Sequence, residues 1–180
     1  TGDKIVIVAP NTHAGVTTYY SLSTNRNIDS TIYGCEIDFN NNVVSPSDET
    51  ELITVERNGN DLSFKLSDGK YLASTQNYGH IDLADSCSDL SARFIATTNT
   101  DGTNSIKLIS ENTNHNGRRL KFNYNGGSRF YRCYTTDSTT GVDPKNRRII
   151  FITINKLSIR NECNKRKFER FGPPYQGRSV

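Results

Sequence analysis

Short β-rich runs recur in three similar units along the chain, and this repeat limits the possible folds more than any other feature of the sequence. The run Tyr20–Thr24 (YSLST) aligns with Tyr71–Thr75 (YLAST), and Gly69–Leu72 (GKYL) resembles Gly117–Leu120 (GRRL). The period is about 50 residues, long enough for one supersecondary unit. Clusters of Asn, Gly, Asp and Ser separate the runs, which is typical of tight turns between strands.

Each unit also contains strands at matching later positions. Third strands are expected around Ile53, Phe94 and Ile149, and fourth strands at Leu62–Leu66 and Ser105–Ile109. The third unit lacks a fourth strand, and Lys4–Val8 can supply it from the N-terminus. Three four-stranded units whose ends meet form a β-trefoil, and closure removes exposed sheet edges. We therefore predict an all-β β-trefoil over residues 1–156, followed by a C-terminal extension over residues 157–180.

The residues of this pattern resemble known families. Gly69–Ala73, followed by Phe94-Ile95 and Ile106–Leu108, is similar to the repeat of fascin-like β-trefoils. The opening Gly2–Val8, together with the closing segment Arg119–Tyr134, looks like a domain that recurs in secreted proteins of gut bacteria. This resemblance implies an exported accessory or binding domain and transfers no catalytic residue. The chain has no Trp, so the Gln-x-Trp signature of ricin-type sugar-binding trefoils is missing.

Charge and hydrophobicity exclude some partners. The chain has 22 basic and 19 acidic residues, and a net charge of +3 is too balanced to favour nucleic acid. No apolar stretch approaches the roughly 20 residues that span a membrane. Because the sequence begins at Thr1 and contains no Met, we expect processing after synthesis, or a fragment. With the resemblance, this favours a secreted or cell-surface location.

The four cysteines, Cys35, Cys87, Cys133 and Cys163, fit two disulfides in an exported protein. The alternative is four unpaired thiols, some of them buried as small apolar side chains.

Sequence motifs for catalysis are absent. The sequence contains no phosphate-binding glycine loop and no G-x-S-x-G turn. Its histidines, His13, His80 and His115, are far apart, and no His or Cys spacing matches a metal site. We therefore expect no enzymatic activity, no cofactor and no metal.

The segment Tyr124–Tyr134 is richest in groups that could recognise a ligand. Tyr and Arg stack on planar surfaces and donate hydrogen bonds, so the candidate ligand-binding residues are Tyr124, Arg129, Tyr131 and Tyr134, with Tyr78 and His80 as a weaker pair. On a strand, Arg129, Tyr131 and Cys133 share one face, while Phe130, Arg132 and Tyr134 share the other. The pattern does not say which face is the core, and the alternative is that about half of these aromatic residues are core.

Beyond residue 156 the composition changes to a basic segment with prolines and aromatics. Lys165, Arg166, Phe168, Phe171 and Tyr175 could anchor a second subunit, because aromatic residues dominate interface energetics. The alternatives are that the tail packs on its own barrel or attracts phosphate or polyanions.

Two functions follow. The first is a non-catalytic extracellular module that binds carbohydrate or a surface polymer. The second is a structural subunit of a homopolymeric filament or adhesin, assembled through the tail.

Overall fold

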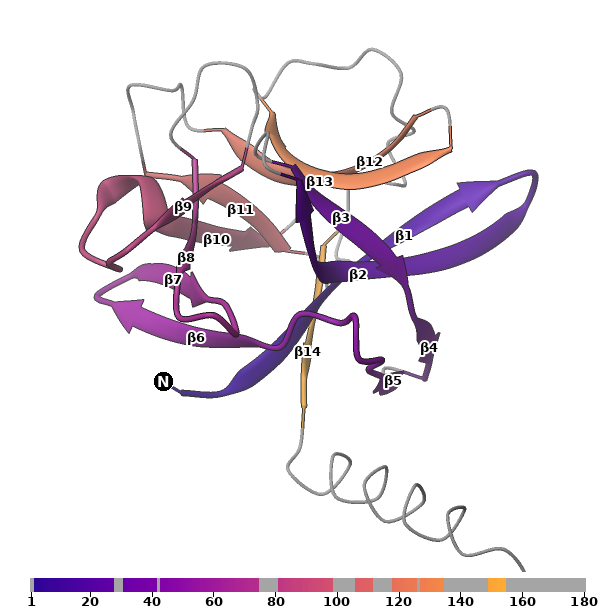
Figure 1. Ribbon diagram of the computed structural model, residues 1–180, viewed down its shortest axis with the longest axis horizontal. Helices are drawn as coiled ribbons and strands as arrows, with labels where there is room; N and C mark the ends of the chain where they lie inside the picture. Colours follow the sequence, from indigo (N-terminus) through magenta and orange to yellow (C-terminus); the bar gives the residue numbers. More distant parts are fainter. Residues whose placement is uncertain are drawn as a thin grey trace, which may run out of the picture.

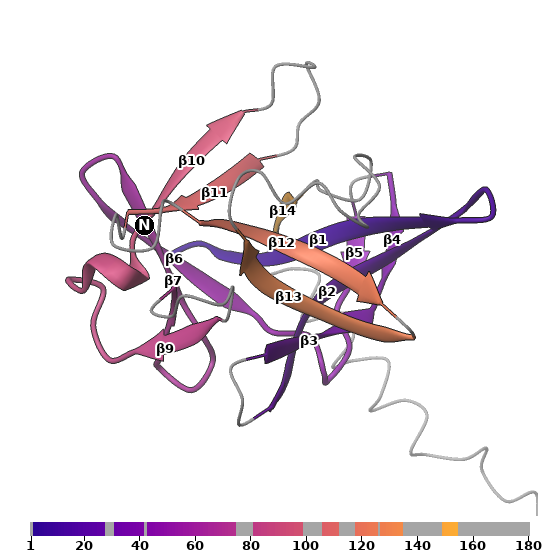
Figure 2. The same ribbon diagram turned by 90° about the horizontal axis from the view of Figure 1, so that it is seen from above.

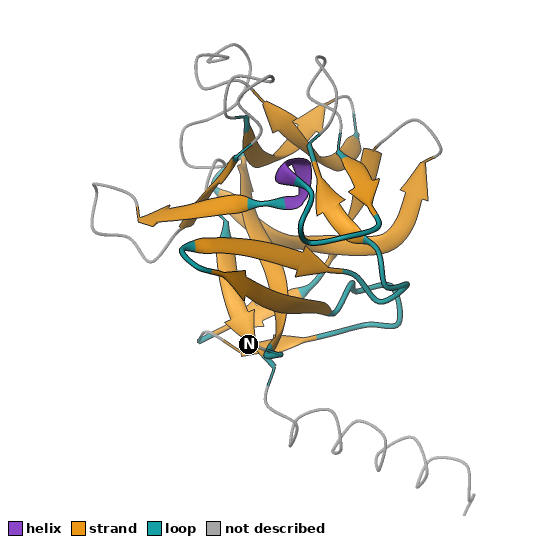
Figure 3. Cartoon of the chain, turned by 90° about the vertical axis from the view of Figure 1, so that its left-hand side faces the viewer, coloured by secondary structure: helices purple, strands orange, loops and turns teal. Residues whose placement is uncertain are grey.

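The computed structural model describes residues 2–27, 31–41, 43–74, 81–98, 106–111, 118–125, 127–134 and 149–154, and these are almost entirely β-structure (Figure 1). Figure 3 shows the short 3-10 helix η1 (Leu90–Ala92) among the strands. None of the helices formed by the described residues has the length and hydrophobicity needed to cross a bilayer. The strands are β1 (Lys4–His13), β2 (Val16–Asn27), β3 (Thr31–Glu36), β4 (Asp38–Asn40), β5 (Val43–Ser45), β6 (Ile53–Asn58), β7 (Asp61–Lys65), β8 (Tyr71–Ala73), β9 (Asp82–Ala84), β10 (Phe94–Thr98), β11 (Ile106–Ser110), β12 (Arg119–Asn125), β13 (Ser128–Tyr134) and β14 (Ile150–Thr153).

The predicted closure by the N-terminal strand is confirmed. β1 pairs antiparallel with β14, with Val6 opposite Ile152, and on its other edge with β6, with Ile5 opposite Ile53. β6 continues into β7, β7 pairs with β10 at Phe94, and β10 pairs with β11. The third and fourth strands of all three units therefore build one wall around the core, and β1 serves as the fourth strand of the third unit.

Three hairpins occupy the equivalent earlier positions of the units: β2–β3, β8–β9 and β12–β13. The first and third hairpins also join each other, because β13 pairs with β3 and places Phe130 opposite Tyr33. Figure 2 shows the β12–β13 hairpin from above, with β2 and β3 close to it. This contact positions the candidate site described below.

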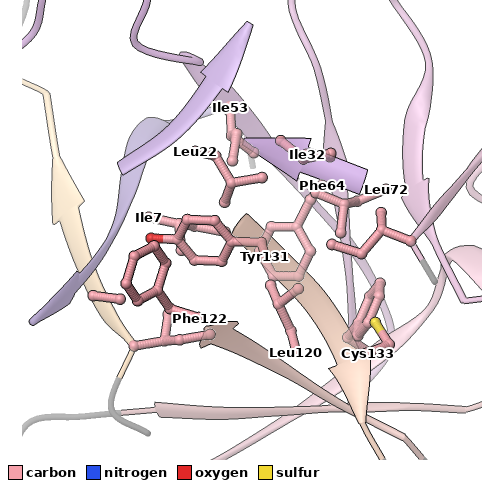
Figure 4. Close-up of a cluster of buried hydrophobic side chains, with 14 of the residues drawn as sticks. Ile7, Leu22, Ile32, Ile53, Phe64, Leu72, Leu120, Phe122, Tyr131 and Cys133 are labelled. Carbon is pink, nitrogen blue, oxygen red and sulfur yellow. The ribbon is translucent and has the colours of Figure 1, made fainter. Parts of the chain in front are cut away.

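Side chains from every unit meet in one core (Figure 4). Leu22 and Ile53 come from the first unit, Leu72 from the second, and Tyr131 from the third, and each of them is 0% exposed. Burying each such side chain contributes about 1.5–3 kcal/mol relative to leaving it exposed. Since no unit buries these groups alone, the repeat in the sequence corresponds to a single shared core.

A second apolar cluster lies on the opposite face of β1. Val6 and Val8 point away from the main core by strand alternation, yet both are 0% exposed. The small β4–β5 hairpin packs there through Val44, and Phe39 lies against Tyr19 with ring centroids 4.6 Å apart.

The β-rich run over residues 31–39 (TIYGCEIDF) by itself predicts one continuous strand, but the structure divides it into β3 and β4. Asn41 has φ +51°, a left-handed conformation that Asn tolerates, and it turns the chain so that β4 pairs with β5. β5 was not predicted, because Val43–Ser45 is too short to show alternation. Elsewhere the predicted strands are present, with ends that shift by a few residues.

Candidate binding site at the tip of the third hairpin

The β12–β13 hairpin divides the candidate residues between its two faces. The register places Phe122 opposite Tyr131 and Tyr124 opposite Arg129 on one face, and Asn123 opposite Phe130 on the other. Phe122 is 1% exposed and Tyr131 is 0% exposed, so their face is the core face.

Tyr131 was predicted to contact a ligand, but the structure places it in the centre of the core (Figure 4). Its ring meets Phe122 edge-on at 5.2 Å, and its hydroxyl donates a hydrogen bond of 2.8 Å to the backbone oxygen of Tyr20. Burial raises the pKa of Tyr131 well above its ordinary value. A ligand at the surface does not reach this residue, because Tyr131 and Arg129 share one face of β13 and the core ends between them.

The hairpin extends past the end of the barrel, so the last pair of residues on its core face, Tyr124 and Arg129, is exposed to solvent. Tyr124 is 40% exposed, and Arg129 opposite it is also exposed. The turn between them contains Gly127 at φ +86°, a conformation that glycine adopts without steric cost. The Arg129 guanidinium carbon lies 5.0 Å from the centroid of the Tyr20 ring, a cation–π distance, and this ring stacks on Phe122. Arg129 is thus held in place by the edge of the core.

Polar groups of the first hairpin complete this arrangement. Tyr20 pairs across β2–β3 with Glu36, which is exposed, and Thr18, two residues earlier on the same face of β2, lies beside the Tyr20 phenol. Burial raises the pKa of Tyr20, and Glu36 adds to the rise, while Arg129 opposes it. These charges therefore lie close to one phenol oxygen. We call this group, Thr18, Tyr20, Glu36, Tyr124 and Arg129, the hairpin-tip site.

Sequence reasoning found Tyr124 and Arg129 but missed Thr18, Tyr20 and Glu36. Tyr20 was recognised as a repeat position of the core, and nothing in the sequence indicates that its hydroxyl reaches the core edge. The pairing of β13 with β3 brings these residues together, and that pairing is not visible in a linear pattern.

Other predicted site residues lie elsewhere. Tyr134 is on the outer face of the hairpin, where its hydroxyl accepts a hydrogen bond of 2.7 Å from the Asn123 amide, so it does not join Tyr124. The remaining candidates lie outside the described residues: Tyr78, His80, Lys165, Arg166, Phe168, Phe171 and Tyr175.

The cysteines do not form the predicted disulfides among the described residues. Cys35, Cys87 and Cys133 are free thiols, and Cys163 lies outside the described part of the chain. Cys133 is 0% exposed, and burial raises its pKa to about 12. Cys35 is buried beside Ser21, with 3.0 Å between the sulfur and the hydroxyl oxygen. Cys35 and Cys133 therefore match the alternative interpretation, in which unpaired thiols are buried as small apolar side chains.

The hairpin-tip site combines an exposed ring, a cation, a carboxylate and a hydroxyl. This set can stack on a ligand and exchange hydrogen bonds with it. Among the residues that the structure describes, no group of three His, Cys, Asp or Glu side chains could hold a metal ion.

The three-unit core and the closed strand order define the chain as a β-trefoil protein, as the sequence predicts. No family model and no curated protein matches its sequence.

Solved structures match it in fold. One described as "BEL beta-trefoil apo crystal form 3" has a TM-score of 0.57 and 16% identity, covering 85% of this chain and 94% of that chain. A salivary protein from Culex quiquefasciatus, of the cysteine and tryptophan-rich family, has a TM-score of 0.53 and 12% identity, covering 86% and 95%. A cytolethal distending toxin from Actinobacillus actinomycetemcomitans has a TM-score of 0.50 and 11% identity, covering 97% and 95%.

Proposed function

We propose that this protein is a non-catalytic, extracellular module that binds carbohydrate or a carbohydrate-containing surface polymer at the hairpin-tip site. The observation that supports this most directly is the solvent-exposed Tyr124 ring directly opposite Arg129, which is itself fixed over Tyr20. A tyrosine ring offers one face of a sugar a large contact area at small entropic cost, because few side-chain torsions have to be ordered.

The charges around Tyr20 suit the hydroxyl groups of a sugar. Arg129 donates hydrogen bonds and the Glu36 carboxylate accepts them, so adjacent hydroxyls can bond to both. The proposal of an extracellular location is supported by the family resemblance and is compatible with the salivary and toxin proteins among the similar folds.

Affinity gel electrophoresis with soluble polysaccharides tests the proposal. The probes are neutral xylan, mannan, laminarin and arabinogalactan, each cast into a native gel. We expect at least one to retard the intact chain, and Tyr124→Ala or Arg129→Gln to weaken retardation about tenfold or more, the loss of one interface anchor. Tyr33→Ala is the matched control, because Tyr33 is also exposed, at 36%, but lies on the other face of the sheet. Equal weakening by Tyr33→Ala would contradict the assignment of the site.

Assembly through the C-terminal residues is the second candidate. One observation favours it: the apolar cluster on the outer face of β1 includes Ile152 and Ile154, so it leads directly into residues 155–180. Light scattering of the intact chain and of a chain ending at residue 156 tests it. Large species formed only by the intact chain would favour the structural subunit, and equal monomers would exclude assembly through these residues.

A further inference from the structure

The outer face of the β12–β13 hairpin, opposite the hairpin-tip site, gathers positive charge. Between Glu111 and Asp137 the sequence contains no acidic residue. By strand alternation, Arg119 and Lys121 of β12 and Arg132 of β13 all lie on the outer face, because Leu120 and Cys133 between them are in the core.

The register places these cations next to one another. Lys121 is directly opposite Arg132, and Arg119, opposite Tyr134, is the diagonal neighbour of Arg132. Like charges directly opposite each other on a sheet are destabilising, so an anion close to Arg119 and Arg132 reduces the repulsion between these cations.

The two arginines also have unused donors. Within the described part of the chain, the Nε atoms of Arg119 and Arg132 are buried and have no hydrogen-bond partner. The Arg132 guanidinium lies over the Phe130 ring, with 4.7 Å from its carbon to the ring centroid, which holds it in one orientation. Both arginine side chains keep partial exposure, so a ligand can reach them from solvent. Buried donors without partners in a native structure commonly indicate an unoccupied ion or water site.

We propose that Arg119 and Arg132, beside Lys121, bind a tetrahedral oxyanion, the sulfate or phosphate group. Guanidinium groups present planar pairs of N–H donors that match the oxygens of such an anion. The anion site itself follows from these residues alone. The further statement, that a glycan carries the anion, rests on the proposed function. The same anion is also available as a free ion in solution. The nearly balanced charge of the whole chain argues against nucleic acid as the carrier.

NMR of the arginine Nε–H groups tests the site directly. Their resonances are assigned by their loss in the single variants Arg119→Gln and Arg132→Gln, and sodium sulfate or phosphate is titrated against sodium chloride at equal ionic strength. We expect the Arg119 and Arg132 signals to shift with saturation, while that of Arg57, exposed on β6, stays unchanged. Shifts that are equal in chloride, or absent at both arginines, would overturn the proposal.

Thermal unfolding gives a second readout. At sulfate concentrations one hundred times Kd, the Tm of the intact chain and of Arg57→Gln should rise by about 5 °C or more over chloride. The double variant Arg119→Gln/Arg132→Gln should lose this increment, and Arg119→Lys/Arg132→Lys should keep only part of it. If the double variant is too unstable to measure, the same increment in Tm is compared between the intact chain and the single variants Arg119→Gln and Arg132→Gln. A double variant that keeps the full increment would contradict the site.

Dextran sulfate beside neutral dextran identifies the carrier. Binding of dextran sulfate with a salt-dependent affinity at least tenfold above that of inorganic sulfate supports a polymer-borne anion, and equal affinities support a free ion. Tighter binding of duplex DNA than of dextran sulfate at the same salt would overturn the glycan carrier. Neutral-glycan binding through Tyr124 should be unchanged in the double arginine variant. Failure of the anion site can therefore be distinguished from failure of the proposed carbohydrate-binding function.

Discussion

The hydroxyl of Tyr131 donates a hydrogen bond of 2.8 Å to the backbone oxygen of Tyr20, and so connects the third hairpin to the first across the core. The same Tyr20 ring stacks on Phe122, and the Arg129 guanidinium lies over it. The geometry of the hairpin-tip site therefore depends on the packing of the core beneath it.

Removing this hydrogen bond should destabilise the fold measurably. Tyr131→Phe leaves the buried Tyr20 oxygen without its partner, which we expect to cost about 1–3 kcal/mol in the free energy of unfolding. Urea denaturation monitored by circular dichroism measures the change. Tyr134→Phe is the control, since the Tyr134 hydroxyl is at the partly exposed outer face and should cost about 1 kcal/mol or less. A larger loss for Tyr134→Phe would contradict the role given to Tyr131.

Gly34 is required by the close approach of β3 to the core. A Cβ atom at this position would lie 2.7 Å from Cε2 of Phe122 and 3.5 Å from Cβ of Tyr20. Gly34→Ala should therefore displace the Phe122 ring, with a loss of about 1–3 kcal/mol in stability. It should also weaken ligand retention, because the displaced ring supports Tyr20. Unchanged thermal stability of Gly34→Ala would show that the core adjusts more freely than the packing indicates.

High pH should destabilise the folded chain through its buried phenols. Burial, with the Glu56 carboxylate that accepts the Tyr71 hydroxyl proton at 2.9 Å, raises the pKa of Tyr71 to about 12. The unfolded phenol ionises near pH 10, so the contribution of Tyr71 is full below pH 10 and is lost as the pH rises to about 12. Tm measured from pH 9 to 12 should fall, and fall less steeply in Tyr71→Phe. Identical slopes would contradict this assignment.

A buried carboxylate links the first two units of the fold. Glu51 is 1% exposed and accepts hydrogen bonds from Arg26, at 2.9 Å, and from the Ser67 backbone, at 2.7 Å. Arg26→Ala leaves this charge buried and unpaired, and should cost about 3–5 kcal/mol. Replacing both partners, as Arg26→Met/Glu51→Leu, should recover most of the lost stability. The control is Arg57→Ala on the exposed end of β6, which should change stability by about 0.5 kcal/mol or less. Urea midpoints distinguish these outcomes.

Much of the fold could be predicted from the sequence because it depends on local signals. The repeat of Tyr20 and Tyr71 marks equivalent buried positions, and the apolar run from Ile5 to Val8 identifies a strand buried on both faces. The same run supplies the fourth strand of the third unit, where it pairs with β14 and β6.

The site was only partly predictable because alternation gives two faces without saying which is buried. Tyr131 and Arg129 share a face, yet one is in the core and the other in solvent, because the barrel ends between them. The contribution of Glu36 follows from the register of β2 with β3, which depends on a bulge between Leu22 and Arg26 that the sequence does not mark.

Binding of the intact chain to a printed array of neutral and sulfated glycans, beside Tyr124→Ala, tests the central claim most directly. We predict a reproducible signal on a related group of glycans for the intact chain, and a loss of about tenfold or more for Tyr124→Ala, with circular dichroism unchanged. No binding of the intact chain to any glycan on the array, or binding that is equally strong in Tyr124→Ala, would contradict a carbohydrate-binding site at the hairpin tip.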